Sequence, residues 1–318
     1  MRRIVGVVGA LLALMLIAAP RAIADTVAFT WNDARIVAPV GLAADLDHTM
    51  YWTANAAAAK TTSVYAVSGE GKVLAAVSYQ RATPGPLAVA YDANRVFVLD
   101  KGTAATALRV SYVTLSGVIV DGTLAYKSWD FTLPETGQTA AALIVAPNTQ
   151  LYVVAQSGRI YKAPATLATS GTNKLTKVSD GTGAVTSGYY DTRQSRVVLR
   201  SAAAIVVADP ATLATTSTVA APAQAGGRGV APSLDGASYL LTAGGSGSGV
   251  LAVSLATPSP TPSPSTAASS SPGSPAASTS GVAVSDADKK ASTTGMLVAF
   301  GAAALLAVVA GGVALVRR

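Results

Sequence analysis

The chain of 318 residues has no cysteine and a single histidine, and only 12% of its residues are charged. The lack of cysteine excludes disulfides, thiolate nucleophiles, cysteine ligands for zinc and a lipid-modified N-terminal cysteine. With no cysteine and His48 as the one histidine, the commonest zinc sites and the pairing of a cysteine nucleophile with a histidine base are also absent. Without disulfides, a domain of about 230 residues must be stabilised by burial of its core alone, and that length suffices for it.

The chain also lacks a basic central region, although its overall balance of 23 basic to 16 acidic residues suggests one. Residues 25–256 contain 16 basic and 14 acidic residues, a net charge of +2. The remaining basic residues lie near the two ends: Arg2, Arg3, Arg21, Lys289, Lys290, Arg317 and Arg318. A nearly neutral domain has no electrostatic footprint for nucleic acid, so we expect no nucleic-acid partner.

The first 24 residues predict a secretory signal peptide. Arg2 and Arg3 form its positive start, residues 4–19 its apolar run, and residues 22–24 its small-residue cleavage site. We expect cleavage between Ala24 and Asp25. The apolar run is shorter than the ~20 residues of a membrane-spanning helix, which favours cleavage over the alternative of an uncleaved N-terminal anchor.

Residues 295–316 form an uncharged run that is followed by Arg317 and Arg318 at the end of the sequence. As a helix this run has a length of about 33 Å, enough to cross a hydrocarbon core of ~30 Å. The two arginines are expected to stay in the cytoplasm as residues 317–318. The sequence therefore predicts a single-pass membrane protein with residues 25–256 outside the cell.

Between these segments, residues 257–294 are rich in Pro, Ser and Thr. This composition predicts a disordered stalk in an extended, polyproline-like conformation, whose hydroxyl groups are candidate O-glycosylation sites. A plain flexible linker without modification is the alternative.

The end of the stalk also resembles the cell-wall sorting signals of Gram-positive bacteria. Those signals contain Leu-Pro-x-Thr-Gly or Leu-Ala-x-Thr-Gly before an apolar run and arginines, and a sortase cleaves them between Thr and Gly. Here Thr294 and Gly295 match and the leading Leu is missing. A sortase-anchored cell-wall protein is therefore the alternative to a retained anchor, with Thr294–Gly295 as the possible sorting site.

The segment 25–256 consists of short runs rich in Val, Tyr, Leu and Thr, separated by Gly, Asn, Asp and Pro, which is typical of antiparallel strands. Five runs recur in similar surroundings: residues 50–53, 96–99, 151–154, 196–199 and 238–241. A period near 45 residues with three or four strands per unit predicts an all-β β-propeller. Another all-β fold, such as a sandwich, is the alternative.

The number of blades follows less directly from the repeats. Five units are visible, and the long interval between residues 97 and 152 has room for a sixth. Residues 27–31 read as a strand that completes a blade together with strands from the end of the domain. The prediction is therefore a propeller of five to six blades.

Two short motifs resemble the extracytoplasmic β-propellers of actinobacteria, of the NHL and YVTN type. They are Gly41-Leu42-Ala43 and, after it, Trp52-Thr53-Ala54-Asn55. The resemblance implies a propeller outside the cytoplasm. Where that family has acidic residues, this chain has Ala56, Leu87-Ala88 and Ala141-Ala142, so the metal site or acid–base role of the family does not carry over.

Candidate site residues are few, and no catalytic residue is predicted. Asp45, Asp47 and His48 form the densest polar cluster, which offers ligands for a cation such as calcium. The alternative is a β-turn whose Asp side chains bond the backbone. The glycine-rich residues 244–249 read as a hairpin loop. Aromatic residues such as Trp52 and Trp129 either stack on a ligand or pack between blades.

These features favour a non-catalytic binding or scaffold module on the cell surface. Its partner would be the cell wall, a protein or a small molecule. The first alternative is a metal-dependent propeller hydrolase or lactonase, which needs clustered acids in the central channel. A structural spacer without a ligand, with a channel filled by apolar side chains, is the second.

Overall fold

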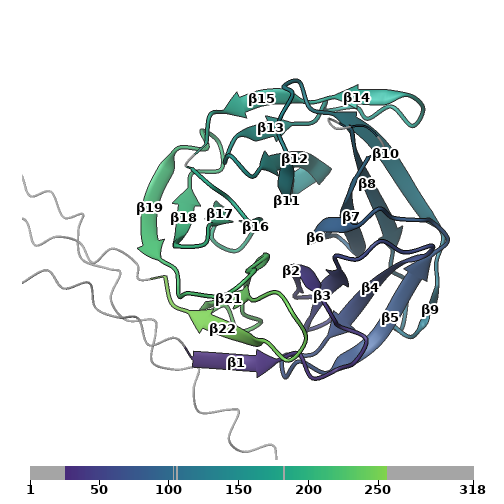
Figure 1. Cartoon of the computed structure of the whole chain (residues 1–318), viewed down its shortest axis with the longest axis vertical. Helices are drawn as coiled ribbons and strands as arrows, with labels where there is room; N and C mark the ends of the chain where they lie inside the picture. The colour runs from purple at the N-terminus through teal and green to yellow at the C-terminus, as the bar shows by residue number, and fades with distance from the viewer. Residues whose placement is uncertain (1–25, 103, 105–106, 182, 256–318) are drawn as a thin grey trace, which may run out of the picture. The chain divides into compact units, whose positions relative to one another are not determined.

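A computed structural model describes residues 26–102, 104, 107–181 and 183–255, and these residues form an all-β propeller of five blades (Figure 1). The predicted cleavage site at Ala24–Asp25, the stalk (257–294), the apolar run (295–316), the sorting site Thr294–Gly295 and the tail (317–318) lie outside the described residues. Within the described part of the chain, no helix is long and apolar enough to cross a membrane.

Each blade is a sheet with four antiparallel strands, the first next to the channel and the fourth at the rim. Blade 1 contains β2 (Pro39–Asp45), β3 (Met50–Asn55), β4 (Thr62–Val67) and β5 (Val73–Tyr79); blade 2 contains β6 (Pro86–Asp92), β7 (Arg95–Lys101), β8 (Ala107–Thr114) and β10 (Tyr126–Thr132). Blade 3 contains β11 (Ala140–Ala146), β12 (Gln150–Ala155), β13 (Ile160–Lys162) and β15 (Thr176–Ser179); blade 4 contains β16 (Ser187–Asp191), β17 (Arg196–Arg200), β18 (Ala204–Ala208) and β19 (Thr215–Ala220). Blade 5 contains β20 (Gly229–Pro232), β21 (Tyr239–Thr242), β22 (Gly249–Val253) and β1 (Thr26–Thr30).

The five recurring runs of the sequence are the second strands of the five blades: β3, β7, β12, β17 and β21. The first strands β2, β6, β11 and β20 contain stretches of small apolar residues that precede those runs in the sequence, at residues 41–44, 87–90, 143–146 and 229–231. In blade 3 a short 3-10 helix, η1 (Pro147–Thr149), makes the turn between the first two strands. The prediction of a propeller built on this repeat is therefore confirmed.

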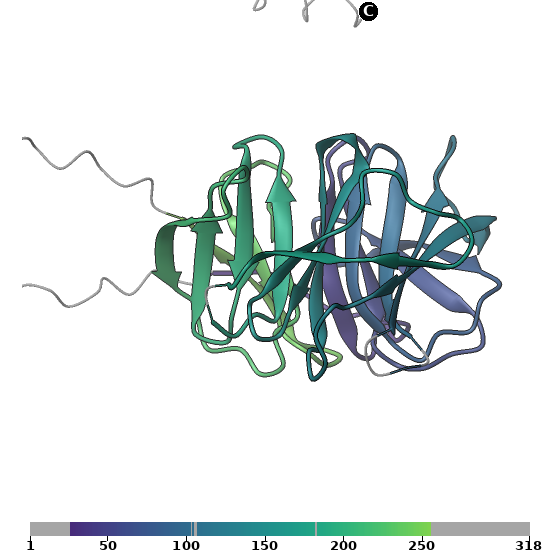
Figure 2. The same cartoon turned by 90° about the horizontal axis from the view of Figure 1, so that it is seen from above.

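The ring is closed by the N-terminal strand of the described domain. β1 pairs antiparallel with β22 and becomes the fourth strand of blade 5, as the sequence predicted. The first strands of successive blades contact one another, and β20 contacts β2 to complete the circle. In the view turned by 90°, the strands run between the two faces of the ring (Figure 2).

A sixth blade in the interval between residues 97 and 152 was a wrong prediction for the described residues, which form five sheets. The extra residues instead form a crossing between neighbouring blades. After β8 the chain reaches back to blade 1, where β9 (Gly122–Thr123) pairs parallel with β5, and then returns as β10. Blade 3 repeats this device, because β14 (Thr172–Lys174) pairs parallel with β10 of blade 2.

Five hydrophobic cores lie between the five pairs of neighbouring blades. The first strands carry small residues because they converge near the axis. At Gly41, with φ +70°, an added Cβ atom would lie 2.5 Å from the backbone nitrogen of Val89 in the next blade. Such an approach permits glycine alone, which accounts for the small apolar stretches in the sequence.

Candidate functional site

The predicted polar cluster lies in the turn between β2 and β3. Asp45 is fully buried, and its carboxylate accepts hydrogen bonds from the backbone nitrogen (3.0 Å) and Nδ1 (2.9 Å) of His48. It also accepts one from Nε1 of Trp52 at 3.0 Å. Both carboxylate oxygens are thus engaged by groups of the same blade, in a turn of the kind that Asp residues commonly stabilise.

Asp47 and His48 lie at the surface of the same turn. The hydroxyl of Tyr91 donates to Oδ2 of Asp47 at 3.3 Å, and the His48 ring is already used by Asp45. Among the described residues, no group of three or more His, Asp or Glu side chains is arranged to hold a metal ion. A calcium site at Asp45, Asp47 and His48 stays a prediction.

Two other blades use an aspartate in the same place. Asp92 ends β6 and pairs with Arg95 at 3.1 Å. Asp191 ends β16, accepts hydrogen bonds from the backbone nitrogen of Arg193 (3.1 Å) and from the hydroxyl of Tyr239, and lies 3.6 Å from Nε of Arg196. Burial, and then the neighbouring Asp191, raise the pKa of Tyr239 above its ordinary value. We call this end of the channel, with the turns that follow Asp45, Asp92 and Asp191, the turn end.

The aromatic candidates are packing residues in this structure. Trp52 is fully buried beside Asp45, and Trp129 stacks on Tyr112 with ring centroids 4.9 Å apart. Tyr189 and Tyr190 point to opposite faces of β16, where each joins a different core between blades. Residues 244–248 lie between the antiparallel strands β21 and β22, in the hairpin loop that the sequence predicted, and Gly249 begins β22.

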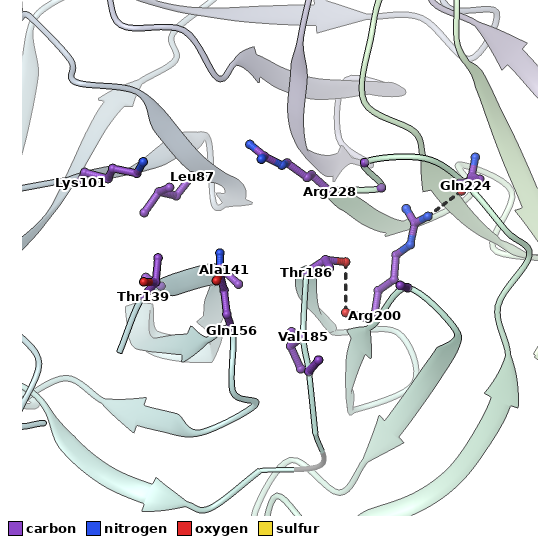
Figure 3. Close-up of a pocket in the computed structure, with 15 residues that line it drawn as sticks. Leu87, Lys101, Thr139, Ala141, Gln156, Val185, Thr186, Arg200, Gln224 and Arg228 are labelled. Carbon is purple, nitrogen blue, oxygen red and sulfur yellow. Dashed lines mark hydrogen bonds between the residues drawn. The ribbon is translucent and has the colours of Figure 1, made fainter. Parts of the chain in front are cut away.

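The opposite end of the channel contains a cavity of about 490 Å³. It lies where the first strands begin and the second strands end, and blades 2 to 5 contribute to it from these strand ends and the loops next to them. Figure 3 shows Lys101, Arg200 and Arg228 around it, from β7, β17 and the loop before β20. We call this the cavity end.

Arg200 is the most deeply buried of the three cations, with 1% of its surface exposed. Its Nη1 donates to the backbone oxygens of Gly229 (2.9 Å) and Thr242 (2.6 Å), and its Nη2 donates to Oε1 of Gln224 (2.7 Å). Nε has no hydrogen-bond partner among the described residues. Arg200 therefore joins blade 4 to blade 5 while its charge remains without a carboxylate.

Two further observations show how closely Arg200 is enclosed. Removal from water lowers the pKa of its guanidinium to about 10. A Cβ atom added at Gly227 would lie 2.1 Å from Nη2, so a larger residue there would displace the guanidinium or the loop that covers it. The sequence gives no sign of this arrangement, because Arg200 belongs to an ordinary strand repeat and meets Gly227 and Gln224 only in the folded ring.

Comparisons with known proteins add little to this picture. No protein-family model matches the chain, and no curated protein matches it. Among solved structures, it is similar to one in a crystal structure of a nidogen/laminin complex, with a TM-score of 0.40 and 16% identity over 64% of this chain and 72% of that one. It is also similar to a protein of unknown function from Bacteroides caccae, with a TM-score of 0.37 and 12% identity over 57% of this chain and 60% of that one. The assignment to the β-propeller class rests on the sheet topology, and no ligand or partner is inferred from either structure.

Proposed function

We propose that this chain is a non-catalytic binding module of the cell surface, which engages its partner at the cavity end of the propeller. The observation that carries the proposal is the cavity of about 490 Å³ at the mouth of the channel. Its volume lies in the range of small-molecule sites, and its wall combines apolar residues such as Leu87 and Val185 with hydrogen-bond donors. A structural spacer, in contrast, would need a mouth filled by apolar side chains.

The rival function is that of a metal-dependent propeller hydrolase or lactonase. Such an enzyme needs carboxylates that converge on a cation in the channel. The described residues that line the cavity are cations, amides, hydroxyls and small apolar groups. This lining favours recognition of a ligand over activation of a metal-bound water.

The cellular setting of the proposal comes from the sequence. The signal peptide (1–24) directs export, the stalk (257–294) holds the domain away from the bilayer, and the apolar run (295–316) anchors it, with residues 317–318 in the cytoplasm. Cleavage at Thr294–Gly295 by a sortase is the alternative mode of attachment. Membership in the NHL and YVTN propellers of actinobacteria belongs to this proposal as well.

The topology is tested on intact cells that express the full chain. Protease added outside is expected to remove the propeller, and a protected propeller would contradict the orientation. Mass spectrometry of the C-terminal peptide separates the two modes of attachment. A peptide that extends to Arg318 indicates a retained anchor, whereas one that ends at Thr294 in the wall fraction indicates sorting.

The binding function is tested by ligand-observed NMR of the protein with a mixture of neutral sugars, peptides and organic acids. We expect at least one compound to bind and to be recovered unchanged. A compound that is converted to product would contradict a non-catalytic role, and the absence of any bound compound would contradict a binding site at the cavity end.

A further inference from the structure

The cavity end concentrates positive charge that no carboxylate of the described residues neutralises. Lys101, Arg200 and Arg228 line the cavity, and among the described residues none of them forms an ion pair. Other cations of the ring, such as Arg95 and Arg196, lie within 4 Å of a carboxylate. The described residues that line the cavity include no acid.

The buried charge of Arg200 has a free-energy cost in the absence of a bound anion. A buried charge is unfavourable unless a counter-charge or hydrogen bonds compensate for its lost hydration. Two backbone oxygens and an amide oxygen bond the Arg200 guanidinium, but within the described residues Nε has no partner and no carboxylate balances the net charge. A bound anion nearby would lower this cost, because electrostatic interactions are strong where water is excluded.

Lys101 and Arg228 add mobile charge on two sides of the opening. Both are exposed, and their charged ends extend into the space between them in Figure 3. Arginine presents a planar fork that suits carboxylate and phosphate groups, whereas lysine acts as a point charge. One fixed and two adjustable cations around one cavity are therefore suited to an oxyanion.

From this arrangement we infer that the cavity end binds a small organic anion with one or two carboxylate or phosphate groups. The inference rests on the proposed binding function and specifies its ligand class. Lys101 and Arg228 hold the oxyanion groups, and Arg200 contributes its charge from the wall. Gln156 and Thr139 offer hydrogen bonds to hydroxyl groups of the ligand, while Leu87 and Val185 contact its carbon skeleton. The volume of about 490 Å³ fits a small molecule and is too small for a folded partner.

The test uses the protein with citrate and with inorganic phosphate, which represent the carboxylate and phosphate sources. Isothermal titration at constant ionic strength is expected to give saturable binding of at least one of them at concentrations below about 10 mM. The double variant Lys101→Ala/Arg228→Ala is expected to weaken that binding by at least about tenfold, because two charge-assisted contacts are lost. Both side chains are exposed, so circular dichroism should show an intact fold.

The matched control is Lys72→Ala/Lys127→Ala. It removes the same charge from exposed lysines beside β5 and in β10, at the opposite face of the ring. Its affinity for citrate or phosphate should equal that of the unchanged protein. Equal weakening by both double variants would overturn the inference, since the effect would then reflect net charge alone.

Two further outcomes separate this inference from the proposed function. If neutral sugars or peptides bind at the cavity end and neither anion does, the anion site is wrong and the binding module stands. If an organic anion binds and is chemically converted, the non-catalytic function is wrong and the anion site stands.

Discussion

The two ends of the channel use charged side chains in opposite ways. At the turn end, Asp45, Asp92 and Asp191 are bonded to His48, Arg95 and Tyr239, so each charge is used within or between blades. At the cavity end, cations gather around a cavity and none of the described ones is paired with an acid.

This difference separates a structural role from a binding role. Charges that hold a turn are bonded to local partners in the free protein. Charges that serve a ligand are left available, and the fold carries the electrostatic cost until the ligand arrives. The following predictions test the distinction, from the largest expected effect to the smallest.

The turn end should be sensitive to loss of Asp45. Replacing it with alanine leaves Nε1 of Trp52 buried without a partner and removes the bonds to His48. Asp45→Ala is expected to lower the free energy of unfolding by about 2–4 kcal/mol, because a buried donor is left unsatisfied. Chemical denaturation measures this loss, with exposed Asp47→Ala as the control.

Asp45→Ala should leave citrate or phosphate affinity unchanged once the protein is folded. A large drop in affinity together with full stability would mean that the turn end, and not the cavity end, carries the ligand.

The stability of the protein is expected to depend on pH through Asp100, which lies where blades 1 and 2 meet. It is 2% exposed and accepts a hydrogen bond from Thr83, and burial raises its pKa to about 6. Because the folded-state pKa lies above the ordinary one, its stability contribution is complete below about pH 4 and is lost as the pH rises through about 6. The shift corresponds to at most about 3 kcal/mol.

The measurement compares thermal unfolding of the unchanged protein and Asp100→Asn from about pH 4 to about pH 8. The asparagine variant keeps an acceptor for Thr83 and should gain stability relative to the unchanged protein as the pH rises. Parallel stability curves for the two proteins would show that Asp100 does not titrate in this range.

The variant Gly227→Ala tests how closely the loop before β20 packs on the guanidinium of Arg200. An added methyl group would lie 2.1 Å from Nη2, so Gly227→Ala must move either the loop or the guanidinium. We expect a loss of about 2 kcal/mol in the free energy of unfolding, as for other overpacked sites. Gly122→Ala is the control, since an added Cβ there meets nothing closer than 4.0 Å.

If Gly227→Ala and Gly122→Ala had the same free energy of unfolding and the same anion affinity, the close packing on Arg200 would contribute neither to stability nor to anion binding.

The smallest effect on stability is expected at the mouth itself. Lys101 and Arg228 are exposed and form no ion pair with the residues that the structure describes, so replacing either with alanine should change the free energy of unfolding by less than about 0.5 kcal/mol. Chemical denaturation of the two single variants measures it. A loss similar to that of Asp45→Ala would assign these cations a structural role.

The sequence was sufficient to predict a propeller made of repeated blades, but it was insufficient to predict how many blades there are. Strand repeats are local, so the runs around Tyr51 and Phe97 and their spacing reveal the propeller. The pairing of β9 with the preceding blade is not local, and a stretch that reaches back to another sheet looks like room for a further blade. Closure by β1 was predictable because its run of residues was left without a blade of its own.

The candidate sites also differ in whether their residues are close together in the sequence. Asp45 and His48 are neighbours in sequence, so their cluster was visible, although the part played by Trp52 as a donor was not. Lys101, Arg200 and Arg228 are far apart in sequence and follow no motif. Their convergence depends on the closure of the ring, which places the ends of β7 and β17 around one opening.

The most direct test of the cavity end as an anion site is a crystal structure of the protein with selenate, whose selenium is located by anomalous scattering. The account predicts an anomalous peak in the cavity, in contact with Arg228 or Lys101 and next to Arg200. Anomalous peaks confined to exposed lysines outside the cavity, or a cavity that holds only water at a saturating selenate concentration, would contradict it.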